Sequence, residues 1–235
     1  MKWTVLHQGV DTAQNHMDMD QKLLKEISTL GHPLLRFYDW KGPCATYGYF
    51  IDPLHYLEPD GIKKIGLTLG RRPTGGGVVF HLTDLAFSVL VPAAHLAYSV
   101  NTLENYAFIN THVVRAVQGF TKKIAPTLLQ KESQPLDEAS RNFCMAKPTI
   151  YDVMIEGKKI GGAAQRRTRD GFLHQGTISI AMPEEALLRT VLKTGTQVME
   201  AMKEHSYVLA DEKQLKETRA ELRRLLELEF LKNER

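Results

Sequence analysis

The chain has 235 residues and a mass of 26.6 kDa, with 43% hydrophobic and 24% charged residues. This ordinary globular composition excludes disordered, collagen-like and low-complexity proteins. Lys and Arg number 30 and Asp and Glu 27, and a net charge of +3 is too small to indicate nucleic acid or a membrane as partner. We expect no signal peptide and no transmembrane segment. With only two cysteines, Cys44 and Cys144, the expectation is a reduced, cytoplasmic protein.

The first half of the chain predicts mainly strands. An opening strand is expected first. A helix capped by Asp11 or Thr12 should follow it, because the apolar residues of this segment lie on one side of a helix. A turn at Gly42-Pro43 separates the next two strands. The expected strands are residues 3–6, 34–38, 45–50, and three within 65–92 around a tight glycine turn.

The second half predicts a long helix over residues 103–120, then a polar loop over 121–142. Strands follow at 151–155 and 159–160, joined by a turn at Glu156-Gly157, and at 177–180 after a turn at 169–171. Pro183 is expected in the first turn of another helix. Runs of strands with helices between some of them indicate an α+β domain around a mixed sheet.

A run of three glycines, Gly75, Gly76 and Gly77, lies in the segment Arg71-Arg72-Pro73-Thr74-Gly-Gly-Gly-Val78-Val79-Phe80-His81. Glycine lets backbone approach a ligand closely, and its amides can face negatively charged oxygens. The two arginines, Arg71 and Arg72, could supply countercharge for a phosphate or carboxylate, and His81 is a candidate polar contact. The spacing fits neither a Walker loop nor a dinucleotide fingerprint, and taken alone the segment is also compatible with a plain hairpin turn.

A second glycine-rich segment carries a lysine, Lys159, ahead of the small residues Gly162 and Ala164. Its ammonium could polarise an acyl carbonyl or neutralise a phosphate, although a solvated basic hairpin is the alternative. The run His174-Gln175-Gly176-Thr177 is polar and begins an apolar strand, where its residues could serve a ligand or only the turn.

Cys144 has apolar neighbours, as a core cysteine does, but Lys147 nearby could favour a reactive thiolate. Cys44 is expected in the core. The histidines show no paired-ligand spacing, so no metal site is expected.

Together these segments resemble the lipoate–protein ligase and octanoyltransferase group, which is related to biotin–protein ligases. The resemblance covers most of the chain and is most specific in residues 71–81, 157–164 and 174–177. It implies the fold of that catalytic domain: a mixed β-sheet flanked by helices, with an apolar tunnel for an acyl chain. We expect this domain to span residues 1–210, with an amphipathic helix over 211–235 packed on it or extending from it.

The implied reaction attaches lipoate or octanoate to one lysine of a lipoyl domain, as found in E2 or H proteins of the 2-oxoacid dehydrogenase and glycine cleavage complexes. By this resemblance Lys159 contacts the reacting carbonyl and phosphate. The positions that resemble substrate- or adenylate-binding ones are Arg72, Thr74, Gly75, Gly76, Gly77, His81, Gly162, Ala164, His174, Gly176 and Thr177.

The resemblance supports two mechanisms. In a ligase, ATP and Mg²⁺ convert the free acid to an acyl-adenylate, which Gly77 and Lys159 favour. In an octanoyltransferase, Cys144 takes the acyl group from acyl carrier protein as a thioester without ATP. Cys144 and the run Pro148-Thr149-Ile150-Tyr151-Asp152, where bacterial ligases usually show Arg-Asn-Asp, favour that branch.

The sequence-based expectation places the ligase slightly ahead, with the transferase as the close alternative. The chain length suggests no appended closing domain, so the ligase hypothesis implies a separate accessory domain or a simplified enzyme. A non-catalytic homologue that binds acyl groups or carrier proteins is a further alternative. Nucleic-acid binding is disfavoured, since no recognition motif surrounds the basic pairs.

Overall fold

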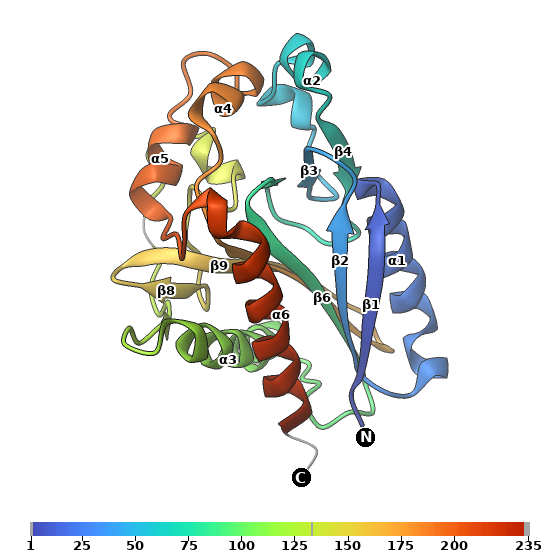
Figure 1. Ribbon diagram of the computed structural model, residues 1–235. Coiled ribbons are helices and arrows are strands. Elements are labelled where there is room, and N and C mark those ends of the chain that lie inside the picture. Colours follow the sequence, from blue (N-terminus) through green and yellow to red (C-terminus); the bar gives the residue numbers. More distant parts are fainter. Residues whose placement is uncertain (1, 133, 233–235) are drawn as a thin grey trace.

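The computed structural model describes residues 2–132 and 134–232 (Figure 1). A seven-stranded mixed sheet in the order β1-β2-β6-β10-β9-β8-β7 runs through its centre. Within this sheet, β1–β2 is the only parallel pair among the described residues, because a helix carries the chain back between these strands. The strands are β1 (Thr4–Asp11), β2 (Leu34–Trp40), β6 (Asp84–Pro92), β7 (Thr127–Leu128), β8 (Val153–Ile155), β9 (Lys158–Arg167) and β10 (Gly171–Ser179).

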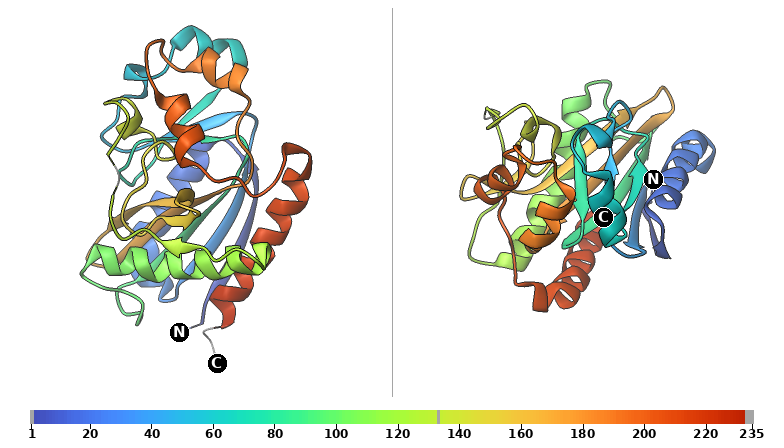
Figure 2. Two further views of the ribbon diagram at one scale, coloured as in Figure 1. Left: turned by 90° about the vertical axis from the view of Figure 1, so that its left-hand side faces the viewer. Right: turned by 90° about the horizontal axis from the view of Figure 1, so that it is seen from above.

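Three long helices cover the two faces of this sheet (Figures 1 and 2). Helices α3 (Thr102–Thr121) and α6 (Leu215–Lys232) pack together on one face and form the largest apolar cluster with the strands. Helix α1 (Ala13–Leu30) covers the other face, where Leu24 and Ile27 pack against β2, β6 and β10. Its N-cap is Thr12, whose side chain accepts from the Asn15 amide, and Gly31 ends it in the left-handed conformation.

A smaller sheet lies at the upper end of the molecule in Figure 1, in the order β4-β3-β5. Three short helices surround it and share its apolar cluster. These elements are β3 (Cys44–Tyr47), β4 (Thr68–Arg71), β5 (Val78–His81), α2 (Pro59–Ile65), α4 (Glu185–Val191) and α5 (Val198–His205), with short 3-10 turns at Pro53–His55, Ser140–Asn142 and Glu212–Gln214. The glycine run, which connects β4 to β5, is thereby placed at the junction of the two sheets.

Most expected strands and the long helix are present, and the mixed α+β prediction is confirmed. Two helices, α2 and α5, were not predicted, since each has only seven or eight residues and too few turns to show a helical period. The expected loop over 121–142 contains the short strand β7 and a 3-10 turn, and α4 begins two residues after Pro183.

The C-terminal helix buries Leu222, Leu226 and Phe230 in the cluster that also holds the central strands. Helix α6 therefore packs as part of the main core, while residues 233–235 of the expected helix lie outside the described residues. None of the helices in the described ranges is both long enough and apolar enough to span a membrane.

Candidate active site

A cavity of about 160 Å³ lies where strands β9 and β10, the glycine loop and the segment 141–149 meet. Ten of the predicted site residues line it: Arg72, Gly76, Gly77, His81, Cys144, Lys159, Gly162, Ala164, Gly176 and Thr177. Thr74, Gly75 and His174 do not. The fold thus brings together three segments that are far apart in the sequence, and Met17 and Tyr38 add apolar wall that the sequence did not indicate.

Lys159 is buried in the wall of this cavity, next to Cys144. Its Nζ donates to the carbonyl oxygen of Cys144 at 2.7 Å and pairs with Oδ2 of Asp152 at 2.7 Å, and it lies 3.4 Å from Sγ of Cys144. Burial lowers the pKa of Lys159, but the charge of Asp152 and the neighbouring sulfur outweigh burial, so the pKa is raised. Lys159 is therefore a fixed positive charge beside the thiol.

A bulge in β9 sets the direction of this lysine. Val153 of β8 pairs with Gly161, whereas the next residue, Met154, pairs with Lys159, so β9 carries one extra residue, Ile160. Ile160 is buried in the cluster under α3, and Lys159 lines the opposite face with Gly162. A Cβ on Gly162 would overlap the end of the Lys159 side chain, so the glycine provides the space through which the lysine reaches Cys144.

Asp152 is held by its own turn. Its Oδ2 accepts from the backbone amide of Thr149 at 2.6 Å and from the Thr149 hydroxyl at 3.0 Å. Tyr151 has a positive φ of 66°, and its carbonyl accepts from the Asn110 amide of α3 at 2.7 Å. The carboxylate is therefore pre-positioned to orient the ammonium of Lys159.

Arg72 gives the cavity a second cation. Its guanidinium is 5% exposed and donates to Oγ1 of Thr46 and to the carbonyl oxygens of Gly75 and Gly77, at 2.9, 3.1 and 2.6 Å. Burial lowers the pKa of Arg72, which the nearby Cys144 partly opposes, and arginine nevertheless stays charged. The guanidinium fixes the glycine loop and adds positive potential near the sulfur.

His81 belongs to a hydrogen-bonded chain that continues from Arg72. Its Nε2 contacts Oγ1 of Thr46 at 2.8 Å and its Nδ1 contacts Oδ2 of Asp84 at 2.7 Å. Since Thr46 already accepts from Arg72, its hydroxyl proton is free to point at Nε2, and Nδ1–H then donates to Asp84. Asp84 also accepts from Thr177. The chain thus orients the guanidinium through an uncharged hydroxyl acceptor, Oγ1 of Thr46, without cancelling its charge.

Close backbone approach explains Gly77. A Cβ there would overlap the carbonyl of Asn142, in the segment that leads to Cys144. The Cys144 amide in turn donates to the carbonyl of Val78 at 3.0 Å. Packing of the cysteine segment therefore requires glycine at position 77, so Gly77 is no indication of a phosphate site.

Strand alternation separates His174 from Gln175. His174 lies against Phe87 and Tyr106 on the sheet face under α3, and burial lowers its pKa to about 3. Gln175 instead lines the cavity, although it was not among the predicted site residues. Gly176 meets the ring of Phe87, where a Cβ would not fit. A direct role for His174 in substrate binding stays a prediction.

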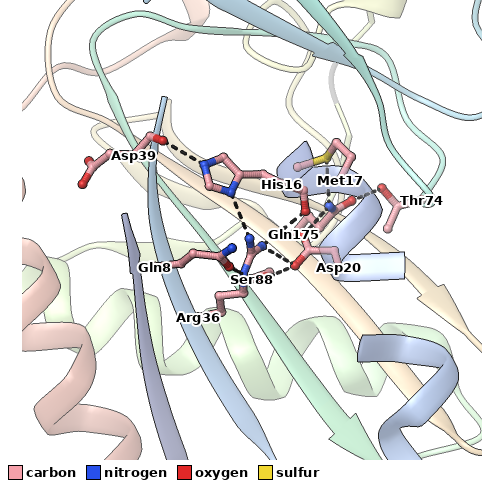
Figure 3. Close-up of polar contacts among 9 residues, drawn as sticks. All are labelled: Gln8, His16, Met17, Asp20, Arg36, Asp39, Thr74, Ser88 and Gln175. Carbon is pink, nitrogen blue, oxygen red and sulfur yellow. Dashed lines mark hydrogen bonds and ion pairs between the residues drawn. The ribbon is translucent and has the colours of Figure 1, made fainter. Parts of the chain in front are cut away.

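Beneath the cavity, Gln175 connects the glycine loop to a buried polar network (Figure 3). Its side chain accepts from the Thr74 hydroxyl at 2.7 Å and donates to Oδ2 of Asp20 at 2.7 Å. Asp20 pairs with Arg36 at 2.6 Å, and neither side chain is exposed. Thr74, which does not line the cavity, thus helps to hold the loop in place. The other members of the network in Figure 3 are Gln8, His16, Met17, Asp39 and Ser88.

Asp152, Asp84 and Thr46 are the site residues that sequence reasoning missed, and Gln175 was noted beside His174 without being assigned to the site. Asp84 could have been predicted from its position three residues after His81. The other residues are recognised only once the strand pairing is known. In the part of the chain that the structure describes, no group of three His, Cys, Asp or Glu could hold a metal ion.

Comparison with known sequences favours the octanoyltransferase alternative. The chain is 30% identical to the octanoyltransferase LipM of Oceanobacillus iheyensis, over 88% of this chain and 74% of that protein. It is 32% identical to LipM of Staphylococcus aureus, over 75% of this chain and 65% of that protein. The prediction that ranked an ATP-dependent ligase first is therefore wrong, because these relatives are octanoyltransferases.

Solved structures agree on the fold. A putative lipoate protein ligase from T. acidophilum with bound lipoic acid superimposes with a TM-score of 0.71 and 24% identity, over 98% of this chain and 85% of that one. A lipoate-protein ligase A bound with ATP gives 0.72 and 24%, over 98% and 84%. The predicted catalytic-domain fold is confirmed. The model of the lipoyl protein ligase A/B catalytic domain matches residues 12–230, and the chain belongs to this family.

Proposed function

We propose that this protein is an octanoyltransferase that works through a thioester on Cys144. The observation that carries the proposal is the distance of 3.4 Å between Nζ of Lys159 and Sγ of Cys144 inside the cavity. The nucleophile of a thioester exchange is the thiolate. A permanent ammonium beside the sulfur stabilises that negative charge, and the LipM relatives support the same reaction class.

The first half-reaction transfers the octanoyl group from acyl carrier protein. The Cys144 sulfur attacks the thioester carbonyl carbon, and the carbonyl oxygen becomes an oxyanion. The C–S bond to the donor then breaks, and the donor thiolate takes a proton. Two hydrogens of the Lys159 ammonium are committed to Cys144 O and Asp152, and the third is available to the sulfur or the oxyanion.

The second half-reaction passes the acyl group to a lysine of a lipoyl domain, in an E2 or H protein. The neutral amine attacks the Cys144 thioester, a C–N bond forms, and the sulfur leaves as a thiolate stabilised by Lys159. No nucleotide takes part. The apolar wall contributed by Met17, Val79 and Phe143 suits a short saturated acyl chain.

Intact-protein mass spectrometry tests the proposal. The wild-type protein is incubated with octanoyl-acyl carrier protein in the absence of ATP, and then with an apo lipoyl domain. We expect an octanoyl adduct that forms without ATP and disappears when the lipoyl domain is added. Cys144→Ala should form no adduct, while Cys44→Ala, which changes a buried thiol outside the cavity, serves as the matched control. An adduct that persists in Cys144→Ala would refute the proposal.

A further inference from the structure

A second, more open cavity of about 320 Å³ adjoins the active-site cavity. The two share four wall residues, Gly76, Thr149, Ala163 and Ala164. Between them the glycine loop faces β9 closely, since a Cβ on Gly76 would lie 3.6 Å from that of Ala164. The wall that the two cavities share is therefore built mostly of small residues, Gly76, Ala163 and Ala164.

The two cavities differ in charge. Arg72, Arg141, Lys147 and Lys159 line the inner cavity and make it cationic. Of the described residues that line the outer cavity, only Glu132 carries a charge at neutral pH. The hydrogen bond from Lys147 holds the pKa of Glu132 below its usual range, so it is a carboxylate. It pairs with Lys147 at 2.9 Å through one oxygen, and its side chain remains 40% exposed.

We propose that the outer cavity is the route by which the acceptor lysine of the lipoyl domain reaches the thioester, with Glu132 as the anionic contact for its ammonium. The inference rests on the proposed function and adds to it the site of the second substrate. An unbranched lysine side chain fits a passage lined by glycine and alanine, and a single carboxylate at its mouth favours a cation over the phosphate of a pantetheine arm.

The charge gradient also suits the chemistry. An ammonium that moves from Glu132 toward Arg72 and Lys159 meets increasing positive potential, which favours its neutral form. The ammonium gives one proton to solvent, the free amine attacks the acyl carbon, and the C–S bond to Cys144 breaks. The sulfur keeps the electron pair and leaves as a thiolate, and the second proton passes from the nitrogen to that thiolate or to solvent as the amide forms. The passage thereby delivers a nucleophilic amine to the thioester.

Two variants test the route through the separate half-reactions. Ala164→Leu narrows the passage and Glu132→Gln removes the charge, while Glu138→Gln, an exposed carboxylate in the same segment, is the matched control. Single-turnover transfer from the octanoyl-enzyme to the lipoyl domain should slow by about tenfold or more in Ala164→Leu and less in Glu132→Gln. Loading of Cys144 should change by a smaller factor in both. Equal factors for the two steps, or a loss confined to loading, would overturn the proposal.

Thiol labelling tests the same route without the acyl reaction. Cys144 is treated with a cationic reagent, aminoethyl methanethiosulfonate, and an anionic one, sulfonatoethyl methanethiosulfonate. Ala164→Leu should slow labelling by the cationic reagent, and Glu132→Gln should lower the ratio of cationic to anionic rates several-fold relative to Glu138→Gln. Unchanged rates would refute the route even if acyl transfer occurs. The expected labelling without any acyl transfer would instead refute the proposed function and retain the route.

Discussion

The side chain of Lys159 crosses β9 over Gly162, in the space that any other residue would fill with its Cβ. The Lys159 side chain can therefore lie where it does only because residue 162 has no Cβ. The bulge at Ile160 turns Lys159 to the cavity face, Gly162 leaves room for its aliphatic stem, and Asp152 holds its ammonium at 2.7 Å. The position of the cation therefore depends on three backbone or side-chain features, and each can be tested.

Replacing Gly162 with alanine should displace Lys159 from Cys144. Because the lysine can no longer reach the sulfur, we expect octanoyl transfer to fall by about 100-fold, the usual effect of losing one pre-positioned charge. The rate of adduct formation, with far-UV circular dichroism to check folding, measures it. Gly9→Ala is the control, because a Cβ there meets no atom within 4 Å. Wild-type rates in Gly162→Ala would show that the lysine is not needed where it lies.

Replacing Asp152 with asparagine should change the pH dependence of transfer. Burial lowers the pKa of Lys159 and Asp152 outweighs it, so in Asp152→Asn the ammonium should lose its proton at lower pH. We expect the alkaline limb of the kcat profile to move down by about one pH unit or more. A profile with an unmoved alkaline limb would exclude Lys159 as the group responsible.

The same pair contributes to stability. Lys159 has a raised pKa in the folded state, so its contribution is complete below the ordinary lysine pKa of about 10.4 and is lost only as the pH rises through the folded value. At pH 7, removing the carboxylate leaves the buried ammonium with the Cys144 carbonyl but without an anionic partner, which should lower the free energy of unfolding by about 3 kcal/mol. Urea unfolding of Asp152→Asn at pH 7 measures it.

Arg72 should not tolerate lysine. Its guanidinium donates to Thr46, Gly75 and Gly77 from one planar group, and a lysine ammonium cannot match that geometry. We expect Arg72→Lys to lose octanoyl transfer by about 100-fold although the charge is kept. Arg71→Lys is the control, because Arg71 is exposed and lies outside the cavity. Similar activity in the two variants would mean that Arg72 acts only through its charge.

The buried pair of Asp20 and Arg36 should matter for folding. Neither side chain is exposed, so Asp20→Leu alone should cost about 3–5 kcal/mol by leaving an unpaired guanidinium in the core. The double variant Asp20→Leu with Arg36→Met should recover part of that loss, because neither charge then remains, although Ser88 and Gln175 still lose their acceptor. Thermal unfolding compares the three proteins. A double variant no more stable than the single one would show that the ion pair itself is required.

The parts of the site that the sequence indicated are those fixed by local chemistry. The glycine run, Lys159 and Cys144 each had a plain structural alternative, and their combination in order along the chain is what indicated a site. Asp152 was not identified because its role depends on the bulge at Ile160, which the sequence pattern does not show. The α+β fold followed from the order of strands and helices, but the separation into two sheets depends on pairing between distant segments.

His174 and Gln175, two neighbouring residues of one strand, also show what the sequence alone does not predict. Neighbouring residues of a strand face opposite sides, and nothing local says which of the two faces the cavity. The structure places Gln175 in the cavity wall and His174 under α3. We therefore expect Gln175→Leu to lower octanoyl transfer by about tenfold through loss of the bond to Thr74, and to raise the KM for the donor.

His174→Phe should retain octanoyl transfer within about threefold of the wild type, since an aromatic ring keeps the packing against Phe87 and Tyr106. The variant loses the hydrogen bond between Nδ1 and the side chain of Gln165, which does not line the cavity that holds Cys144. Burial lowers the pKa of His174 to about 3, so the histidine is neutral over the whole working range and should contribute no limb to the pH profile of transfer. Steady-state assays compare octanoyl transfer by His174→Phe and Gln175→Leu between pH 5 and pH 9, a range in which His174 keeps one protonation state. A larger loss of transfer in His174→Phe than in Gln175→Leu, together with an altered pH profile, would mean that His174 contacts the reacting groups. The prediction that His174 binds substrate would then be correct.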